Sequence, residues 1–296
     1  MRLIFTDLDG SLLDHHSYSF APAVPLLAEL DALGIPVIPI TSKTFAEVIT
    51  LRGDLDNQHP FIVENGAAIY IPSRYFKSQP EHALLENNFW VLRNVPRRAK
   101  WQQLLTERVA NFNGEFETFY SLYATSGAAG VAAITGLDLH AAELANQREH
   151  SEPVHWIGTK ERKRTFVYRL KEAGATVLQG GRFLNIGGDV DKGRAMLQLR
   201  DLYLRDANIS QPKHCETCCL GNSSSRRKPE CPVLKLYAEP PDDALVASFY
   251  GLVAEGWHLE LSGNCRLSSS LFNRPNGRCS DEPVTTPAVH CFSSGR

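Results

Sequence analysis

The N-terminal stretch Leu3-Ile4-Phe5-Thr6-Asp7-Leu8-Asp9-Gly10-Ser11-Leu12-Leu13 contains the strongest signal in this chain. It opens with a short apolar run typical of a buried strand, and two carboxylates one residue apart follow directly. Residues i and i+2 of a strand point to the same side, and ligands of open α/β sheets bind beyond the carboxyl ends of the strands. Asp7 and Asp9 are therefore predicted to face one site, with Gly10 allowing a sharp turn after the strand.

Two carboxylates in this arrangement suit phosphoryl transfer, because one can attack phosphorus while the other moves the proton. Asp7 is the predicted nucleophile, and Asp9 is the predicted acid and base. The alternative for a bare Asp-x-Asp is a solvated turn or a helix N-cap. The complete string after an apolar strand favours the catalytic interpretation.

Strand and helix patterns alternate along the first part of the chain. The strand-like segments are residues 3–5, 37–40 and 61–63, and the helical segments are residues 24–33, which Gly34 ends, and 45–52. Such alternation predicts an α/β fold with a doubly wound parallel sheet.

The string from Asp7 to Ser11 resembles the first motif, DxDGT/S, of the haloacid dehalogenase (HAD) superfamily. The apolar run 35–40 ends in Thr41-Ser42-Lys43-Thr44, which resembles the second motif, a strand that ends in Thr or Ser. We expect the Thr41 hydroxyl to bind a phosphate oxygen, beside a helix N-terminus that favours anions. A simple helix cap over residues 41–44 is the alternative.

The segment Gly187-Gly188-Asp189-Val190-Asp191-Lys192-Gly193-Arg194-Ala195 precedes the amphipathic stretch 196–204. It resembles the superfamily's third motif, in which a lysine at a helix start neutralises the nucleophile and the phosphoryl oxygens. Lys192 suits that role, since a compact ammonium is a good partner for phosphate. A solvated lysine is the alternative.

The insertion between the second and third motifs resembles the α/β cap of the superfamily's C2 class. The expected division is a core formed by residues 1–82 and 181–221, a cap over residues 83–180, and an anomalous region over residues 222–296. Within the cap we expect a strand over residues 112–123, a helix over 141–148 and a further element over 165–172. Closure of such a cap excludes water from the site.

Two strings in the insertion narrow the resemblance to the mannosyl-3-phosphoglycerate phosphatases: Arg148-Glu149-His150-Ser151-Glu152-Pro153 and Gly180-Gly181-Arg182-Phe183. The resemblance implies a small phosphorylated sugar acid as substrate. Arg148, Arg182 and Lys43 are the cationic candidates for such a ligand, and Ser151 could contact its hydroxyls. Each is also compatible with a surface or capping role.

The segment Glu64-Asn65-Gly66-Ala67 resembles one found near the active site of large-cap HAD phosphatases, and Asn65 is its candidate substrate-binding residue. A plain Asn-Gly turn is an equal alternative. Other phosphatases with the same cap, acting on sucrose phosphate or on a glucosyl-phosphoglycerate, are further functional alternatives.

The resemblance implies Mg²⁺ as cofactor, with Asp7 and Asp9 among its ligands. The superfamily's fourth motif, G-D-x-x-N-D, supplies further acids, but here Gly221 is followed by Asn222 and no acid occurs before Glu230. Asn222 is a weak substitute, and Asp242 with Asp243 is another. Since Mg²⁺ prefers hard oxygen ligands, an inactive HAD-fold binding protein is a third functional hypothesis.

From residue 222 onward the sequence is rich in Ser, Cys, Arg and Pro, and strand-helix alternation fades. All seven cysteines occur late in the chain: Cys215, Cys218, Cys219, Cys231, Cys265, Cys279 and Cys291. One hypothesis is out-of-frame translation, since codons allowed for Ser224–Arg227 encode Pro-Ala-Asp-Glu one nucleotide later. A divergent natural C-terminus is the alternative, and a zinc site around Cys215 and Cys218 is a weaker one because its ligand spacing is irregular.

The composition fits an ordinary folded protein, with 43% hydrophobic residues over 296 positions. The net charge of -2 gives no electrostatic reason to expect nucleic acid or membrane binding. No apolar run reaches the length of a membrane span, and the N-terminus has no signal-peptide pattern. A cytoplasmic protein is the expectation.

Overall fold

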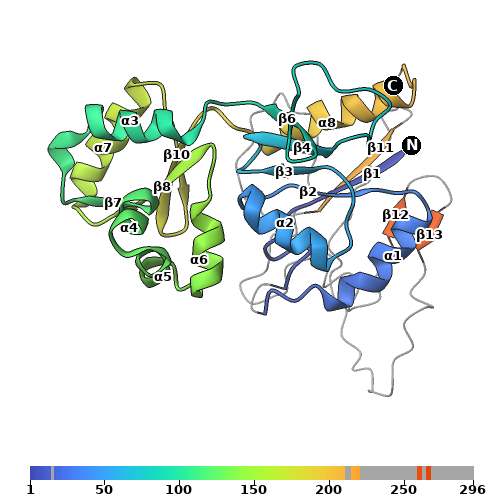
Figure 1. Cartoon of the computed structure of the whole chain (residues 1–296), viewed down its shortest axis with the longest axis horizontal. Helices are drawn as coiled ribbons and strands as arrows, with labels where there is room; N and C mark the ends of the chain where they lie inside the picture. Colours follow the sequence, from blue (N-terminus) through green and yellow to red (C-terminus); the bar gives the residue numbers. More distant parts are fainter. Residues whose placement is uncertain (15–16, 211–214, 221–258, 262–264, 268–296) are drawn as a thin grey trace, which may run out of the picture.

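The computed structural model describes residues 1–14, 17–210, 215–220, 259–261 and 265–267. Two modules lie side by side in Figure 1: a core that contains the N-terminal strand, and a second module built from residues 98–187, called the cap below. The chain passes from core to cap after β6 and returns before α8.

A parallel sheet forms the centre of the core. Strand β1 (Arg2–Thr6) lies between β11 (Glu216–Leu220) and β2 (Val37–Pro39), and both pairings are parallel. An isolated parallel bridge from Ile40 to Ile62 continues the sheet to β3 (Phe61–Val63). The strands predicted from the apolar runs therefore lie next to one another, with their carboxyl ends at one edge.

Beyond β3 the sheet becomes antiparallel. The order is β3-β4-β6-β5, with β4 at Ala68–Pro72, β5 at Leu84–Glu86 and β6 at Phe89–Arg93. The short turn after β3 leaves no room for the crossover helix that parallel neighbours need. The doubly wound sheet is thus parallel from β11 to β3 and antiparallel further out.

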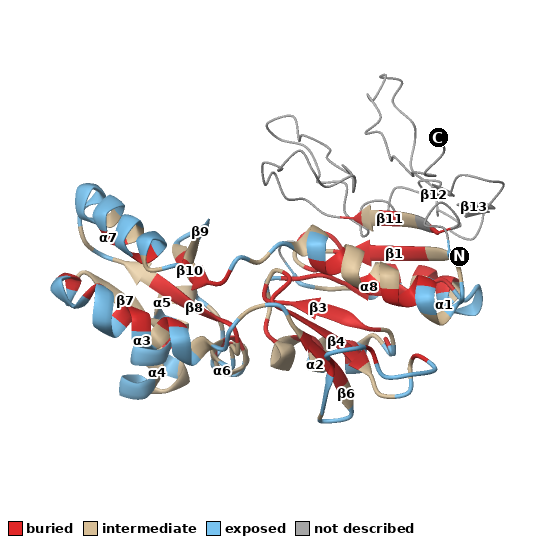
Figure 2. Ribbon diagram, turned by 90° about the horizontal axis from the view of Figure 1, so that it is seen from above, coloured by how far each residue is buried: buried red, intermediate tan, exposed pale blue. Residues whose placement is uncertain are grey.

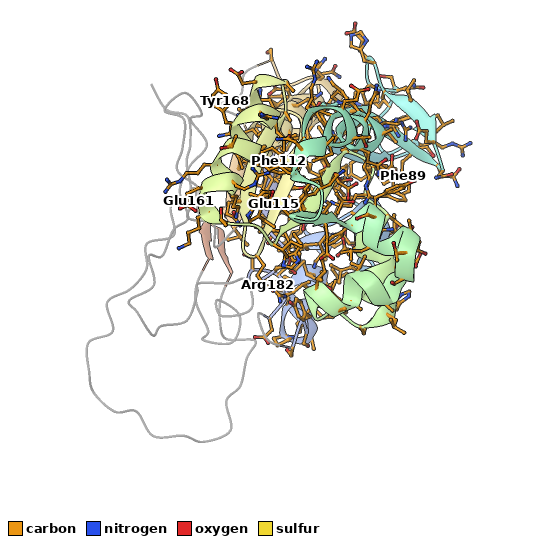
Figure 3. The ribbon with its side chains drawn as sticks, turned by 90° about the vertical axis from the view of Figure 1, so that its left-hand side faces the viewer. Phe89, Phe112, Glu115, Glu161, Tyr168 and Arg182 are labelled. Carbon is orange, nitrogen blue, oxygen red and sulfur yellow. The ribbon has the colours of Figure 1, made fainter. Side chains whose placement is uncertain are left out.

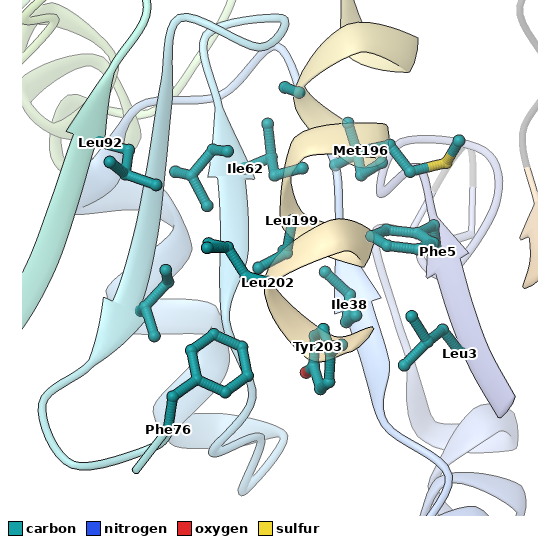
Figure 4. Packing of buried hydrophobic residues seen from close by; sticks show 14 of the residues in the cluster. Leu3, Phe5, Ile38, Ile62, Phe76, Leu92, Met196, Leu199, Leu202 and Tyr203 are labelled. Atoms are coloured by element: carbon teal, nitrogen blue, oxygen red, sulfur yellow. The ribbon is translucent and has the colours of Figure 1, made fainter. Parts of the chain in front are cut away.

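Helices cover both faces of the parallel strands. One face packs against α1 (Val24–Ala32), which follows the 3-10 turn η1 (Ala21–Ala23), and against α2 (Phe45–Asp54); the other packs against α8 (Lys192–Asp206). Because neighbouring residues of a strand point to opposite faces, Ile4 belongs to the first cluster, and Leu3 and Phe5 to the second. Figure 1 shows the strands between α8 and the helices α1 and α2, Figure 2 shows that these strands are buried, and Figure 4 shows the packing against α8. The α/β fold with helices on both faces is confirmed.

The cap has its own four-stranded antiparallel sheet, in the order β7-β8-β10-β9. Its elements are α3 (Arg98–Arg108), η2 (Ala110–Phe112), β7 (Phe116–Thr118), α4 (Phe119–Ser126), α5 (Ala128–Thr135), α6 (Leu139–Asn146), β8 (Ser151–Trp156), α7 (Lys160–Glu172), β9 (Thr176–Gly180) and β10 (Phe183–Gly187). A separate apolar cluster, including the fully buried Trp101 and Phe166, joins α3 and α7 to this sheet. The inserted α/β cap is confirmed.

The strand pairings bear on where the modules divide. Strands β5 and β6 follow residue 83 yet pair in the sheet of β4, and β10 follows residue 180 yet pairs with β8 and β9. The chain segments that connect core and cap are called the crossings below. The strand pairing favours crossings near residues 94–97 and 188–191 over the expected boundaries at 83 and 180. The two crossings touch, because a Cβ on Gly188 would lie 2.5 Å from Val95 Cγ1.

The expected strand over residues 112–123 is wrong for most of its length. Only Phe116–Thr118 is a strand, and α4 begins at Phe119. Thr118 caps this helix: its hydroxyl accepts from the Ser121 amide, while the Ser121 hydroxyl accepts from the Thr118 amide. This capping box and the four-residue spacing of Phe119 and Tyr123 favour a helix over the β propensity of the aromatic residues. The helix expected over 141–148 is present as α6, and residues 165–172 are the end of α7.

The described residues after β11 are β12 (Leu259–Leu261) and β13 (Cys265–Leu267), which pair as antiparallel strands. Asn222, Cys231, Asp242 and Asp243 lie outside the described residues. In the described part of the chain, no helix has the length and apolar character needed to cross a bilayer.

Candidate active site

Asp7 lies at the carboxyl end of β1, where its backbone amide donates to the Leu220 carbonyl of β11 at 2.8 Å. Its side chain is fixed by two donors: the Leu8 amide donates to Oδ1 at 2.9 Å, and Lys192 Nζ lies 2.8 Å from Oδ2. Lys192 is the first residue of α8, and the preceding residue, Asp191, caps that helix. The ammonium therefore offsets the charge of the predicted nucleophile across 185 residues of sequence.

Asp9 follows in the turn after β1, where Gly10 adopts the left-handed conformation at φ 69°. Its Oδ1 lies 2.9 Å from Lys43 Nζ. The Asp9 side chain is 40% exposed, whereas that of Asp7 is 18% exposed. The more accessible carboxyl is thus the one predicted to exchange protons with a leaving group and water.

Lys43 lies between two carboxylates, since its Nζ is also 3.8 Å from Glu47 Oε1. Burial disfavours the ammonium, but the charges of Asp9 and Glu47 outweigh that effect and raise the pKa of Lys43. The side chain therefore stays charged at neutral pH. Its cation is available at the edge of the sheet where an anionic ligand is expected.

Thr41 is buried at the end of the second predicted strand, and residues 41–44 form what we call the Thr41 loop. The Thr41 hydroxyl oxygen accepts from the Lys43 amide at 3.1 Å. Thr44, at the end of this loop, caps α2 through a capping box with Glu47. The helix-cap interpretation therefore holds for Thr44, whereas Thr41 orders the loop and its O–H can still donate to a ligand.

The turn from Glu64 to Ala67 supports this loop and the start of α8. The Asn65 amide donates to the Thr41 carbonyl at 2.9 Å, and the Glu64 amide donates to the Lys43 carbonyl at 3.0 Å. Gly66 has φ 100°, and a Cβ there would lie 2.6 Å from the Asp191 carbonyl oxygen. The segment is a turn, as the simpler interpretation had it, and it also holds two site-bearing segments together.

Arg148 and Ser151 reach the core from the cap. Arg148 donates through Nε to Ser151 Oγ at 3.0 Å and through NH2 to the Ser42 carbonyl at 2.8 Å. Arg182 has a different environment: it is exposed and donates to the Thr135 carbonyl, within the cap, at 2.6 Å. It is labelled in Figure 3, where the cap faces the viewer. The contacts thus join Arg148 and Ser151, but not Arg182, to the Thr41 loop.

Glu64 is the residue at this site that the sequence prediction missed. It is 2% exposed, and its carboxylate accepts from the backbone amides of Glu149 and His150 and from Ser151 Oγ. The motif at residues 64–67 was recognised in the sequence, but only Asn65 within it was predicted to bind substrate. An acid directly after a buried strand was the available signal.

Asp7 and Asp9 are the oxygen donors predicted to hold a metal. Within the described ranges, no group of three or more His, Cys, Asp and Glu side chains has a metal-binding arrangement. The Asp7 carboxylate and the Asp9 backbone carbonyl are hard oxygen donors of the kind that Mg²⁺ prefers, but alone they do not complete its shell. Cys215, Cys218 and Cys219 lie within these ranges and belong to no such group.

The core and cap have counterparts among known proteins. Residues 4–87 match the family of haloacid dehalogenase-like hydrolases. The fold resembles a solved protein of Thermotoga maritima at TM-score 0.50 and 18% identity, covering 73% of this chain and 78% of that one. It also resembles a phosphatase of the HAD superfamily from Bacteroides thetaiotaomicron at TM-score 0.50 and 13% identity, covering 76% and 78%. Residues 4–87 thus have the sequence pattern of a haloacid dehalogenase-like hydrolase, and the whole described chain has a fold of the same kind.

Closer sequence relatives narrow the class. A glucosyl-3-phosphoglycerate/mannosyl-3-phosphoglycerate phosphatase of Methanococcoides burtonii is 35% identical over 202 residues, which is 68% of this chain and 73% of the relative. A mannosyl-3-phosphoglycerate phosphatase of Pyrococcus furiosus is 34% identical over 206 residues, covering 69% and 79%. The chain belongs to the mannosyl-3-phosphoglycerate phosphatase family of the HAD superfamily.

Proposed function

We propose that this protein hydrolyses mannosyl-3-phosphoglycerate, or a close glycosyl-3-phosphoglycerate, through an aspartyl-phosphate on Asp7. The observation that carries the proposal is the ordered Asp7 carboxylate, held 2.8 Å from Lys192 Nζ at the end of β1 with Asp9 two residues on. The names of the relatives from Methanococcoides and Pyrococcus support the choice of substrate.

In the first step, an Asp7 carboxylate oxygen attacks phosphorus and the bond from phosphorus to the glycerate oxygen breaks. Asp9 gives its proton to the departing oxygen, which leaves as an alcohol. Lys192 and the Thr41 hydroxyl bind the phosphoryl oxygens, so repulsion between the anionic substrate and Asp7 is reduced. As in other phosphoryl transfers, positioning and charge neutralisation provide most of the catalysis.

In the second step, Asp9 removes a proton from water, which attacks the phosphorus of the aspartyl-phosphate. Phosphate leaves, and the Asp7 carboxylate and protonated Asp9 are restored. The 40% exposure of Asp9 gives it access to both the leaving alcohol and the water.

The substrate proposal rests on charge as well as on the relatives. A glycosyl-phosphoglycerate carries a phosphate and a carboxylate, and Lys43 provides a cation beside the Thr41 loop. Arg182 is the remaining proposed contact, from the cap. Phosphate release should be highest with mannosyl- or glucosyl-3-phosphoglycerate in a panel that includes sucrose phosphate. A preference for sucrose phosphate would reject this substrate class.

We propose Mg²⁺ as the cofactor, with Asp7 and Asp9 among its ligands. When bound, it would add positive charge against the phosphoryl oxygens. Calorimetric titration should show saturable Mg²⁺ binding that Asp7→Asn weakens. Absence of binding by this chain, with binding by a version translated in the alternative frame after about residue 222, would assign the missing ligands to that region.

The decisive variant is Asp7→Asn, because an amide is a poor nucleophile of nearly the same shape. We expect phosphate release to fall by roughly 10⁴-fold or more while thermal unfolding stays near that of the parent. Asp201→Asn, at a half-exposed carboxylate on α8, is the matched control and should retain activity. Turnover by Asp7→Asn at the parent rate would refute the nucleophile assignment.

A further inference from the structure

A buried carboxylate joins the cap to the core. Glu64, which follows β3, is 2% exposed. Its carboxylate accepts from the Glu149 amide at 2.8 Å, the His150 amide at 3.2 Å and Ser151 Oγ at 2.5 Å. Arg148 Nε lies 3.6 Å away as an ion-pair partner. The three donors and the ion-pair partner all come from residues 148–151, which lead into β8 of the cap.

This arrangement depends on where the cap lies. A buried carboxylate is tolerated only when it is paired and hydrogen-bonded, and Glu64 has these partners only while residues 148–151 rest against the core. Moving the cap away would remove all of these partners together. The position of the cap and the hydrogen bonding of the Glu64 carboxylate are therefore coupled.

Arg148 extends the same contact to the Thr41 loop. Its guanidinium donates to the Ser42 carbonyl at 2.8 Å, and its side chain is only 10% exposed. A second bond from Thr44 Oγ1 to the Leu144 carbonyl, at 2.9 Å, ties the end of the loop to α6 of the cap. The loop proposed to bind phosphate is thus held from the cap at two points.

Glu64 also holds this loop from the core side. Its amide donates to the Lys43 carbonyl at 3.0 Å, and the next amide, of Asn65, donates to the Thr41 carbonyl at 2.9 Å. One residue therefore binds the loop through its backbone and the cap through its side chain.

We propose that Glu64 is a positioning residue that sets the cap on the core and aligns the Thr41 loop with Asp7. Arg148 and Ser151 then act on Glu64 and Ser42 and not directly on the substrate. The inference rests on the proposed phosphatase reaction, and it gives these residues a different task from the sugar-acid contact expected from their sequence strings.

The first test is Glu64→Gln. The amide keeps the size of the side chain but removes the charge and one acceptor, so it cannot satisfy the same donors. We expect kcat/KM for mannosyl-3-phosphoglycerate to fall about 10- to 100-fold, the cost of slight misplacement of catalytic groups. Hydrogen exchange at the Glu149 and His150 amides should accelerate. Parent-like kinetics in Glu64→Gln would overturn the proposal.

A double-mutant cycle separates positioning from direct substrate contact. If Ser151 acts on Glu64, Ser151→Ala should lower kcat/KM in the parent but have little further effect in Glu64→Gln. An equal loss in both backgrounds would place Ser151 on the substrate and overturn the proposal. If Glu64→Gln does not fold, Glu64→Asp completes the cycle, since it keeps the charge and shortens the reach.

Glu152→Gln is the matched control, because Glu152 is also fully buried but pairs with Arg98 inside the cap, at 2.9 Å from NH2. It should lower cap stability without accelerating exchange at the Glu149 and His150 amides. The same exchange and kinetic change in both variants would show a general loss of cap stability and reject a specific role for Glu64. The Asp7→Asn variant tests the proposed phosphatase reaction independently of Glu64. Parent-like turnover by Asp7→Asn would reject the proposed function, whereas parent-like kinetics in Glu64→Gln alone would reject only the positioning role of Glu64.

Discussion

Single residues at this site differ in how far the sequence could identify them. Asp7 and Lys192 were predicted because each belongs to a local string, and the structure places them 2.8 Å apart. Glu64 could not be assigned its contacts, because its donors come from residues 85 to 87 positions away in the chain. Burial and long-range donors are properties of the folded molecule, and no local pattern encodes them.

Gly66 provides a test at this scale. Substitution by alanine places a Cβ 2.6 Å from the Asp191 carbonyl oxygen, and the residue already has φ 100°. A backbone contact cannot be relieved by changing a rotamer, so Asp191 and the adjacent Lys192 must shift. We expect Gly66→Ala to lose about 1–3 kcal/mol of unfolding free energy and about 10-fold or more in kcat.

Gly34→Ala is the matched control for this prediction. Gly34 also has positive φ, 66°, but a Cβ there would meet nothing within 4 Å. It should show a loss of about 1 kcal/mol in denaturant unfolding, with kcat unchanged. Parent-like kcat in Gly66→Ala would show that Lys192 does not depend on this contact.

Among the elements, those with clear periodicity and end signals were predicted well, including α1, α2 and α8. The segment 112–123 was not, because its aromatic residues suit strands as well as helices. The capping box at Thr118 decided the outcome locally, and packing of Phe119 into a buried cluster with Val131, Ala142 and Ala145 supported it. The antiparallel pairing after β3 was also missed, since strand direction depends on partners.

The start of α2 gives a prediction at the element scale. Thr44 is fully buried; its hydroxyl accepts from the Glu47 amide at 3.1 Å and donates to the Leu144 carbonyl of the cap at 2.9 Å. Thr44→Ala should therefore cost about 2 kcal/mol or slightly more, measured by urea unfolding.

Thr159→Ala offers the comparison, because Thr159 caps α7 but is exposed and accepts from the Arg162 amide at 3.3 Å. Its loss should be about 0.5–1 kcal/mol. Equal losses in the two variants would mean that the contact between Thr44 and the cap adds nothing to stability.

For the whole molecule, the buried His150 and the partly buried His59 predict how stability varies with pH. Burial is the main cause that lowers the pKa of both His59 and His150 below 6.5; nearby carboxylates oppose it. The folded state therefore binds fewer protons than the unfolded state. The contribution of these histidines to the free energy of unfolding has its full value above about pH 6.5. It decreases as the pH falls from there toward the folded pKa, by up to about 1.4 kcal/mol per pH unit for each group.

His150→Gln should make the unfolding free energy less sensitive to pH between about 7 and 5, as followed by urea unfolding across that range. His140→Gln, at an exposed position of α6, should retain the parent slope. A steeper acid-side decline in His150→Gln would contradict the assigned direction.

The contact between Gly188 and Val95 brings the outgoing and returning chain together at one place. Two connections far apart would restrain the cap in every direction. Two connections that lie together form a single joint, about which the cap can rotate. Rotation about this joint would separate residues 148–151 from Glu64, so these contacts fix the angle between cap and core. Lengthening either crossing would loosen that joint and widen the range of angles open to the cap.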